Sequence, residues 1–331
     1  MENKFLVSVL IPVYGTEKYV EKCISSVLNQ TMQEGVEVII VNDCTPDRSM
    51  EKIFEALRAY SEKKQKHPKM TVRVVEHDTN RGLAAVRNTA VNQAKGDYIL
   101  HVDSDDWIEP DMLEKMYNKA VTEDADIVIC DYFIQFIHYK VLFRKTYTQK
   151  ESYFGEMIAG NHIPLWNKLI KRELYEKYNI SAIEGLDAGE DYVTMLPIMY
   201  HATRIVYIPY ALYHYVKYNP NSITRKMTDK VKRNIHQRVD FAKRFVCQYN
   251  LHQYDKELAF LILSEKVRLL EASLPSERKD IKRLWPEADK YLPIFLKNTS
   301  LYNRLVLNNH ITIAHTLASF KRALKFILRR Y

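Results

Sequence analysis

The chain has 331 residues, of which 47% are hydrophobic and 27% are charged, with 8 glycines and 11 prolines. This composition is typical of a folded globular protein and excludes collagen-like, linker-like and disordered chains. The four cysteines are far apart and form no CxxC pair, which argues against a disulfide framework or a zinc site and predicts a reduced, cytosolic compartment.

Charge is distributed unevenly along the chain. The first 224 residues carry 26 Lys and Arg against 31 Asp and Glu, whereas the rest carry 23 against 10. Such an excess of basic residues predicts that the C-terminal region lies next to an anionic surface outside the protein. No window reaches the roughly 18 to 20 apolar residues of a membrane-spanning helix, and residues 5–13 lack the cleavage site of a signal peptide.

The first hundred residues alternate apolar, β-branched runs with segments of helical period. The predicted strands are residues 5–13, 36–42, 72–76 and 98–102. The predicted helices between them are residues 17–30, 49–64 and 83–94. This alternation predicts an α/β fold with a mostly parallel central sheet and helices on both faces. Because the strands are almost continuously apolar, we expect them inside the sheet.

Beyond Pro110 the pattern becomes mixed. We predict a helix to residue 121 and then a strand at 127–130. An aromatic-rich segment at 132–147 is predicted to be antiparallel, and two short strands are predicted within 203–216. From residue 228 the pattern is helical to the end. We therefore predict a domain of residues 1–225 and a basic helical C-terminal region of residues 226–331.

The strand at 98–102 is followed directly by a cluster of acidic residues, Asp103, Asp105 and Asp106. Carboxylate oxygens suit Mg²⁺ or Mn²⁺, and such ions often bind one or two carboxylates together with substrate phosphates. The cluster is therefore a candidate site for a metal diphosphate. The alternative is that Asp105 or Asp106 caps the helix after Pro110 and the remainder is a solvated loop.

Two further polar clusters are weaker signals by themselves. Asn42, Asp43 and Thr45 end the second strand, where a carboxylate can accept hydrogen bonds from a nucleobase, although such residues also end strands in ordinary turns. Glu190 and Asp191 begin an apolar helical stretch. Acidic residues are favoured at a helix start by the helix dipole, but a carboxylate there can also act as a general base. Since ligands bind at the carboxyl ends of parallel strands, we expect the first two clusters to converge with residues 12–15.

Several common site motifs are missing from the sequence. GxGxxG does not follow the first strand, and GxxxxGK[ST], GxSxG and HExxH do not occur. The sequence therefore gives no support to a dinucleotide-binding dehydrogenase, a P-loop kinase, a serine hydrolase or a zinc protease of the usual kinds.

Six segments taken in order resemble the family 2 glycosyltransferases, over about residues 5–225. They are VSVLIPVY at 7–14, CISSVLNQT at 23–31, EVIIVNDCTPD at 37–47, NRGLAAVRN at 80–88, GDYILHVDSDD at 96–106 and GED at 189–191. The resemblance implies a GT-A fold, which is Rossmann-like. It also implies transfer of a sugar from a nucleotide diphosphate sugar, and it favours UDP as the nucleotide. In this family the transfer usually inverts the anomeric configuration and is assisted by a divalent cation.

The same resemblance implies roles for individual residues. It assigns nucleotide-sugar binding to a group of side chains: Pro12, Tyr14, Glu17, Asp43, Arg81 and Asp103. Asp105, together with Asp103, matches the DXD pattern that holds Mn²⁺ or Mg²⁺. Asp191, with Glu190 beside it, matches the catalytic base. The chain departs from the common pattern at Asn42, where a second Asp is usual, and at Gly15, where Asn is frequent.

Two later segments, LWNKLI at 165–170 and LYHYVKYNPNSIT at 212–224, resemble bacterial members that build capsule, exopolysaccharide or lipopolysaccharide chains. Trp166 is a candidate for stacking on an acceptor sugar, the alternative being a core position. Lys168 is a candidate phosphate contact. The loop at 218–225 is expected to fold over the donor, with His214, Asn221 or Ser222 touching it, the alternative being ordinary turn residues. The acceptor is then a saccharide or a lipid-linked saccharide of cell-surface polysaccharide synthesis.

The last twenty residues form an amphipathic basic pattern. Its apolar positions recur at helical spacing: Ile313, Leu317, Phe320, Leu324, Ile327 and Tyr331. Such a helix binds the inner face of an anionic membrane or packs its apolar stripe on the protein, and the sequence leaves both open. It predicts a cytoplasmic protein with possible peripheral membrane contact. Nucleic-acid binding is not expected, because no recognised motif accompanies the charge.

Two other function classes compete with an active enzyme. A catalytically silent sugar-binding or scaffold subunit of a polysaccharide assembly complex is the first, and the presence of Asp43, Asp103, Asp105 and Asp191 argues against it. A nucleotidyltransferase is the second. It calls for a Gly-rich, Arg-containing loop after the first strand, where this chain has Tyr14, Gly15 and Thr16.

Overall fold

The structure is a computed structural model that describes residues 4–63, 70–144, 150–161, 164–219, 227–308 and 310–328. The chain forms two compact units, the first of residues 1–154 and 163–226 and the second of residues 155–162 and 227–331. The second unit thus includes a short segment, Gly155–His162, that lies far upstream of the single boundary predicted near residue 225. Each unit is described by itself.

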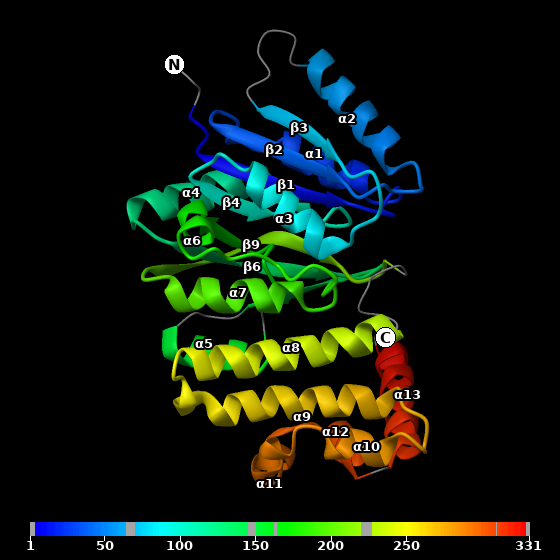
Figure 1. Ribbon diagram of the computed structural model, residues 1–331. Helices are drawn as coiled ribbons and strands as arrows, with labels where there is room; N and C mark the ends of the chain where they lie inside the picture. The colour runs from blue at the N-terminus through cyan, green and yellow to red at the C-terminus, as the bar shows by residue number, and fades with distance from the viewer. Residues whose placement is uncertain are drawn as a thin grey trace. The chain divides into compact units, whose positions relative to one another are not determined.

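The first unit alternates strands and helices through its N-terminal half (Figure 1). Its strands are β1 (Val7–Val13), β2 (Val36–Asn42), β3 (Thr71–Glu76), β4 (Tyr98–His101), β5 (Trp107–Ile108), β6 (Ile127–Gln135), β7 (Lys140–Phe143), β8 (Lys168–Lys171) and β9 (Ile205–Val216). Its helices are α1 (Val20–Leu28), α2 (Ser49–Lys63), α3 (Leu83–Gln93), α4 (Met112–Thr122), α6 (Arg172–Lys177) and α7 (Glu190–His201), and α5 (Lys150–Ile158) crosses the division between the units.

The described strands form one mixed sheet in the order β3-β2-β1-β4-β8-β6-β9-β5, with β7 paired to β6. The first four strands in this order are mutually parallel, and β8 pairs antiparallel with both β4 and β6. The predicted α/β fold is therefore confirmed. Parallel neighbours require crossover connections, and α1, α2 and α3 supply them in the predicted order.

Alternate side chains of the sheet point to opposite faces, because the side-chain period of a strand is two. On one face, Val7, Val9 and Ile11 of β1 belong to a core cluster that also contains buried residues of α1, α2 and α4. On the other face, α3 packs against β1 and β2. Helices thus cover both faces of the N-terminal half of the sheet.

The predicted pair of strands within residues 203–216 is wrong, because β9 is one strand that pairs in parallel with β6 along most of its length. The register shifts where Cys130 pairs with Ile208 but Asp131 pairs with Ala211. Pro209 and Tyr210 lie in the gap between these pairs. A proline has no N–H to donate to the ladder, so it is accommodated in an irregularity of the strand and does not end it. The strand at 127–130 likewise continues to Gln135.

A buried polar network fixes the start of β4 beside β1. Ser8 Oγ donates to Glu37 Oε1 at 2.6 Å, and the other carboxylate oxygen of Glu37 pairs with Arg73 at 2.6 Å. The Gly96 N–H donates to Ser8 Oγ at 2.8 Å. A Cβ atom on Gly96 would lie 2.6 Å from the Ser8 nitrogen, so this close approach of two chains requires glycine.

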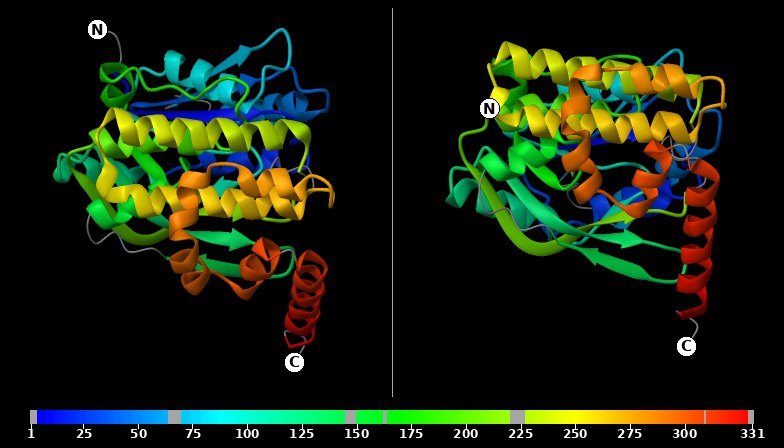
Figure 2. Two further views of the ribbon diagram at one scale, coloured as in Figure 1. Left: turned by 60° about the horizontal axis from the view of Figure 1, so that its bottom comes forward. Right: turned by 90° about the horizontal axis from the view of Figure 1, so that it is seen from below.

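The second unit is helical (Figure 2). Its elements are α8 (Asp229–Gln248), η2 (His252–Tyr254), α9 (Asp255–Glu271), α10 (Arg278–Arg283), η3 (Pro286–Tyr291), α11 (Leu292–Asn298), α12 (Leu301–Leu307) and α13 (Ile311–Leu328). Among the described residues, two clusters of buried apolar side chains lie around α9. The start of α13 joins the second cluster through Ile311 and Ala314, whereas Ile313 and Leu317 are exposed.

Candidate active site

Three loops meet at one edge of the sheet, because β2, β1 and β4 are adjacent and parallel and their carboxyl ends lie together. The loop after β1 is tied to the loop after β2, since the Gly15 N–H donates to Thr45 Oγ1 at 2.8 Å and the Glu17 N–H donates to Asp47 Oδ2 at 3.0 Å. The Cys23 thiol of α1 approaches the Asp103 carbonyl of the third loop. The predicted convergence of these loops is present in the structure.

Residues assigned to the nucleobase pocket lie in the first two loops. Tyr14 is half exposed directly after β1, whereas Pro12 is buried within the strand beside Val41. Cys44 has a φ of +53°, a backbone conformation that non-glycine residues rarely adopt. Backbone strain of this kind is found preferentially in functional loops. The positive φ of Cys44 gives the loop after β2 this property.

Asp43 is 2% exposed, and its carboxylate is engaged by its own chain. Oδ1 accepts from the Arg81 N–H at 2.9 Å and contacts His77 Nδ1 at 2.7 Å, and Oδ2 accepts from the Gly82 N–H at 2.8 Å. Asp43 therefore fixes the turn that leads into α3. Gly82 has a φ of +90°, and that turn requires glycine. The Arg81 side chain is exposed and pairs with Glu184 at 3.0 Å.

The acidic residues after β4 have separate partners, although they are close in sequence. Asp106 is 1% exposed and accepts hydrogen bonds from the Val216 N–H at 2.6 Å and from the Tyr213 hydroxyl at 2.8 Å. Asp105 accepts from Asn219 Nδ2 at 2.7 Å. Neither residue caps the following helix, whose N-cap residue is Asp111. Asp106 thus attaches the acidic loop to β9.

Burial, together with the nearby charge of Asp103, raises the pKa of Asp105 to about 6. This is the electrostatic situation that a bound cation relieves, because the cation favours the charged forms of both carboxylates. In the described ranges, no three His, Cys, Asp or Glu side chains gather closely enough to hold a metal ion. The donor set of Asp103 and Asp105 nevertheless fits Mg²⁺ or Mn²⁺, because these ions commonly take one or two carboxylates and complete their shell with phosphate oxygens and water.

Arg87 of α3 joins three carboxylates from two distant parts of the chain. Its Nη2 lies 3.0 Å from Asp103 Oδ1, 3.4 Å from Glu190 Oε1 and 3.4 Å from Asp191 Oδ1. Asp103 Oδ1 and Asp191 Oδ1 both contact Nη2 of Arg87. The distance between these two oxygens therefore cannot exceed the sum of their distances to that nitrogen. Arg87 is 3% exposed, so its charge acts in a poorly solvated environment. The predicted base, Asp191, and the predicted diphosphate-site residue, Asp103, thus contact the same guanidinium.

Glu190 and Asp191 occupy different electrostatic positions beside Arg87. Burial, together with the charge of Asp191, raises the pKa of Glu190 to about 8. Burial also raises the pKa of Asp191, but the charge of Arg87 opposes the rise. The Asp191 side chain is 26% exposed and the Glu190 side chain 8%. At neutral pH Glu190 is therefore protonated, and Asp191 is the more accessible carboxyl group of the pair.

Glu190 is expected to make the folded state less stable as the pH rises. Its pKa of about 8 lies above the ordinary value of 4.5, so the folded state binds the proton more tightly than the unfolded state does. The stabilisation is complete below about pH 4.5 and is lost as the pH rises through 8. Urea unfolding from pH 4.5 to 8.5 should show a flatter pH dependence for Glu190→Gln. The exposed Glu184→Gln is the control and should keep the original slope, and equal slopes in all three proteins would contradict the assignment.

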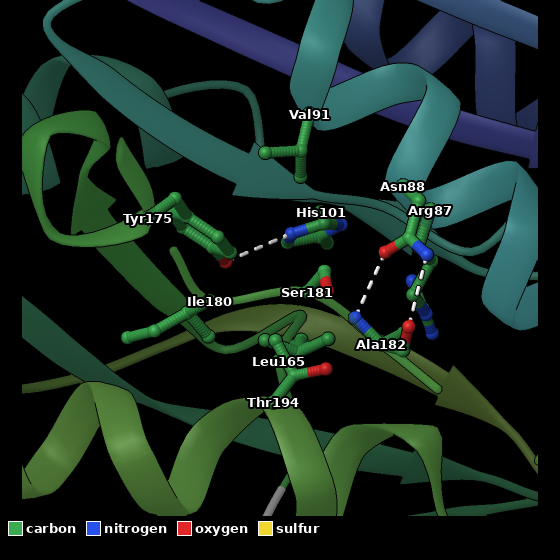
Figure 3. A pocket seen from close by; sticks show the side chains of 10 residues that line it. All are labelled: Arg87, Asn88, Val91, His101, Leu165, Tyr175, Ile180, Ser181, Ala182 and Thr194. Carbon is green, nitrogen blue, oxygen red and sulfur yellow. Dashed lines mark hydrogen bonds between the residues drawn. The ribbon is translucent and has the colours of Figure 1, made fainter. Parts of the chain in front are cut away.

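Segment 180–191 is fastened to α3. Asp187 Oδ1 accepts from the Ala84 N–H at 3.0 Å. Asn88 binds Ala182 twice, with its side-chain amide donating to the Ala182 carbonyl at 2.9 Å and its Oδ1 accepting from the Ala182 N–H at 2.8 Å (Figure 3). These bonds connect residues about 100 positions apart. They hold the start of α7, and with it Asp191, against Arg87.

The three residues predicted to contact the acceptor or the donor from later segments are all buried. Trp166 is 5% exposed and stacks on Tyr213 with ring centroids 4.3 Å apart, so it takes the core position that the sequence left as the alternative. Lys168 is 0% exposed and donates to the Pro164 carbonyl at 2.6 Å. His214 is 4% exposed and lies 2.7 Å from Glu109. In this structure none of them presents an exposed face to a substrate.

Three residues of the site had no role assigned from the sequence. Arg87 lies in the segment NRGLAAVRN, and Tyr213 and Asn219 lie in LYHYVKYNPNSIT, so the motifs marked the segments but not the contacts. The contacts join positions 16 to 114 residues apart, which no local pattern encodes. Of the predicted donor-covering loop, residues 220–225 lie outside the described residues.

The sequence matches the family model Glycosyl transferase family 2 over residues 8–178. Putative glycosyltransferase EpsH of Bacillus subtilis is 34% identical over 276 residues, which cover 80% of this chain and 76% of that protein. Uncharacterized glycosyltransferase EpsJ of the same organism is 29% identical over 304 residues, which cover 84% and 81%.

The fold is similar to a crystal structure of S. aureus TarS 1-349 in complex with UDP-GlcNAc, with a TM-score of 0.65. The sequences are 18% identical, and the alignment covers 96% of this chain and 92% of the other. At this identity the likeness concerns the fold, and the expected GT-A fold is confirmed. None of the helices in the described part of the chain is both long and apolar enough to span a membrane.

Proposed function

The chain belongs to glycosyl transferase family 2, and we propose that it transfers a sugar from a nucleotide diphosphate sugar to a hydroxyl group in a single inverting displacement. The observation that supports this most is the sharing of the Arg87 guanidinium by Asp103 and Asp191. It brings a residue of the acidic loop and a candidate base close enough to act on one substrate. Asp43 binds the backbone of Arg81 and Gly82 in the turn that leads into α3, the helix that carries Arg87.

Asp191 is the proposed general base. The acceptor hydroxyl forms a bond to the anomeric carbon while the bond from that carbon to the diphosphate oxygen breaks, and the electron pair leaves with the diphosphate. Asp191 takes the hydroxyl proton. Glu190 is unsuited to this step because it is protonated at neutral pH, whereas Arg87 favours the ionised form of Asp191. A single displacement needs no second carboxylate as nucleophile.

The acidic loop is the proposed diphosphate site. Asp105 and Asp103 would hold Mg²⁺ or Mn²⁺, and the ion would supply positive charge to the leaving diphosphate. Tyr14, half exposed at the edge where the loops meet, would stack on the nucleobase, and Glu17, Arg81 and Asp43 would complete the nucleotide pocket. The preferred donor in this proposal is a UDP sugar, because a fold neighbour was solved with UDP-GlcNAc.

Metal-dependent donor binding tests this assignment. With UDP present at about 100 times its dissociation constant, binding stabilises the protein by about 2.7 kcal/mol, which is a rise in melting temperature of several degrees. We expect this rise with Mn²⁺ and UDP together, and its loss in Asp105→Ala. The control Asp111→Ala removes a nearby, partly exposed carboxylate and should show the same rise in melting temperature with Mn²⁺ and UDP as the unmodified protein. A full thermal shift in Asp105→Ala would refute the proposed metal site.

The proposed acceptor is a saccharide or lipid-linked saccharide of cell-surface polysaccharide synthesis, approached at the inner face of an anionic membrane through α13. Two apolar residues of the predicted stripe, Ile313 and Leu317, are 52% and 38% exposed, so the second unit does not bury them. The remaining members, Phe320, Leu324, Ile327 and Tyr331, have side chains outside the described part of the chain. An exposed apolar stripe with basic neighbours is typical of an interfacial helix.

Membrane binding by α13 predicts that Ile313→Ser with Leu317→Ser lowers association with vesicles of phosphatidylcholine and phosphatidylglycerol several-fold. The reason is loss of apolar area that enters the lipid headgroup region. The matched control is Leu274→Ser with Leu301→Ser, which removes side chains 66% and 53% exposed elsewhere in the same unit. Cosedimentation measures both, and equal association of the two double variants would contradict the role of α13.

A further inference from the structure

A small cavity lies within the first unit, beside the guanidinium of Arg87 (Figure 3). Its volume is about 10 Å³, close to the space that one water molecule needs. His101 of β4 lines it from one side and Thr194 of α7 from the other, and Arg87 of α3 is also part of its wall. The contacts with the carboxylates described above are made by Nη2 of Arg87, and its Nε and Nη1 are two further donors of the same side chain.

Three of the residues that line the cavity carry four buried polar atoms with no hydrogen-bond partner among the described residues. They are Nε and Nη1 of Arg87, Nδ1 of His101 and Oγ1 of Thr194. The three residues are 3%, 1% and 4% exposed, so bulk water does not reach these atoms. Buried polar groups without partners are rare, and several around one cavity point to a bound polar molecule. The apolar residues Leu165, Val91 and Ile180 line the rest of the wall.

The chemistry of the four atoms identifies the molecule. Arg87 offers two N–H donors. His101 Nε2 lies 3.1 Å from the Tyr175 hydroxyl, and if the ring proton is on Nε2 then Nδ1 is an acceptor. A water molecule accepts two hydrogen bonds and donates two, and it therefore matches two Arg87 donors together with Nδ1 and the Thr194 hydroxyl. An anion matches less well, because Asp103, Glu190 and Asp191 surround the opposite edge of the guanidinium.

We propose that this cavity binds one structural water molecule that links Arg87 to His101 and Thr194, and that this water fixes the plane of the guanidinium. The carboxylates contact only Nη2, about which the guanidinium can tilt, whereas bonds to Nε and Nη1 define its orientation. Thr194 and His101 are thus positioning residues that act on Asp103 and Asp191 through Arg87. The catalytic consequence rests on the proposed function, but the water site itself does not.

A crystal structure of the full chain, at a resolution that shows its other buried waters, tests the site directly. We expect a density peak in the cavity within hydrogen-bond distance of Arg87, His101 and Thr194. Thr194→Val removes the hydroxyl at nearly constant shape, and Thr194→Ser keeps it. The peak should persist in the Ser variant and weaken or vanish in the Val variant. A cavity without density in the unmodified protein, at that resolution, would overturn the proposal.

Steady-state kinetics test the positioning role. For Thr194→Val we expect kcat to fall about tenfold with KM for the donor nearly unchanged, because misorientation of catalytic groups affects the transition state more than ground-state binding. Thr194→Ser should restore kcat, which a purely steric role would not predict. Unchanged kcat in the Val variant would overturn the positioning role. Absence of transfer in the unmodified protein with every nucleotide sugar would contradict the proposed function instead, and would leave the crystallographic result valid.

Discussion

Asp191→Asn is expected to reduce the rate of sugar transfer by about 100-fold or more, with little change in donor binding. General base catalysis contributes roughly 10² to 10⁴ to a rate, and an amide cannot accept the proton of the acceptor hydroxyl. The substitution keeps the size of the side chain and one oxygen atom. It removes the charge of one of the three carboxyl groups around Arg87, and Asp103 and Glu190 keep their contacts with that guanidinium.

The measurement is transfer under single-turnover conditions, together with thermal shift by UDP and Mn²⁺ on the same samples. Glu173→Gln, an exposed carboxylate at the start of α6, is the control and should be fully active. Parallel variants of Glu190 separate the two carboxyl groups. Because Glu190 is protonated at neutral pH, Glu190→Gln should retain most of the activity. Transfer that persists in Asp191→Asn but is lost in Glu190→Gln would exchange their roles.

The N-terminal half of the fold follows from local patterns. Strands β1, β2 and β4 are short, nearly continuous apolar runs, and helices of clear period lie between them. The rule for parallel sheets then places the loops that follow these strands at one edge, so the meeting of residues 12–15, 42–45 and 103–106 could be predicted without coordinates. Here one physical constraint, burial of both faces of the sheet, determines both sequence and structure.

The assignment of individual carboxylates could not be predicted in the same way. Asp103, Asp105 and Asp106 are nearly equivalent in sequence, yet the first pairs with Arg87, the second with Asn219 and the third with Tyr213. Each partner comes from another element, at a separation of 16, 114 or 107 residues. A local pattern cannot specify such contacts. The same limit applies to Trp166, whose aromatic neighbours come from β6 and β9 and bury it in the core.

Arg87→Met is expected to destabilise the protein by about 3 to 5 kcal/mol near neutral pH and to abolish transfer. Removing one partner of a buried ion pair leaves the remaining charges uncompensated. Here Asp103, Glu190 and Asp191 would face one another without the cation that now lies within 3.4 Å of each.

The effect of Arg87→Met on stability should shrink as the pH falls, because burial raises the pKa values of Glu190 and Asp191, and their protonation relieves the repulsion that remains without the guanidinium. Arg87→Lys keeps the charge but not the planar fork, so it should recover stability more than activity. The control is Arg48→Met, which removes an exposed guanidinium paired with Glu51 and should leave stability close to unchanged. Urea unfolding from pH 5 to 8 distinguishes the variants. If Arg87→Met and Arg48→Met unfold alike at every pH, the guanidinium does not hold these three carboxylates together, and the proposed arrangement of base and diphosphate site loses its physical basis.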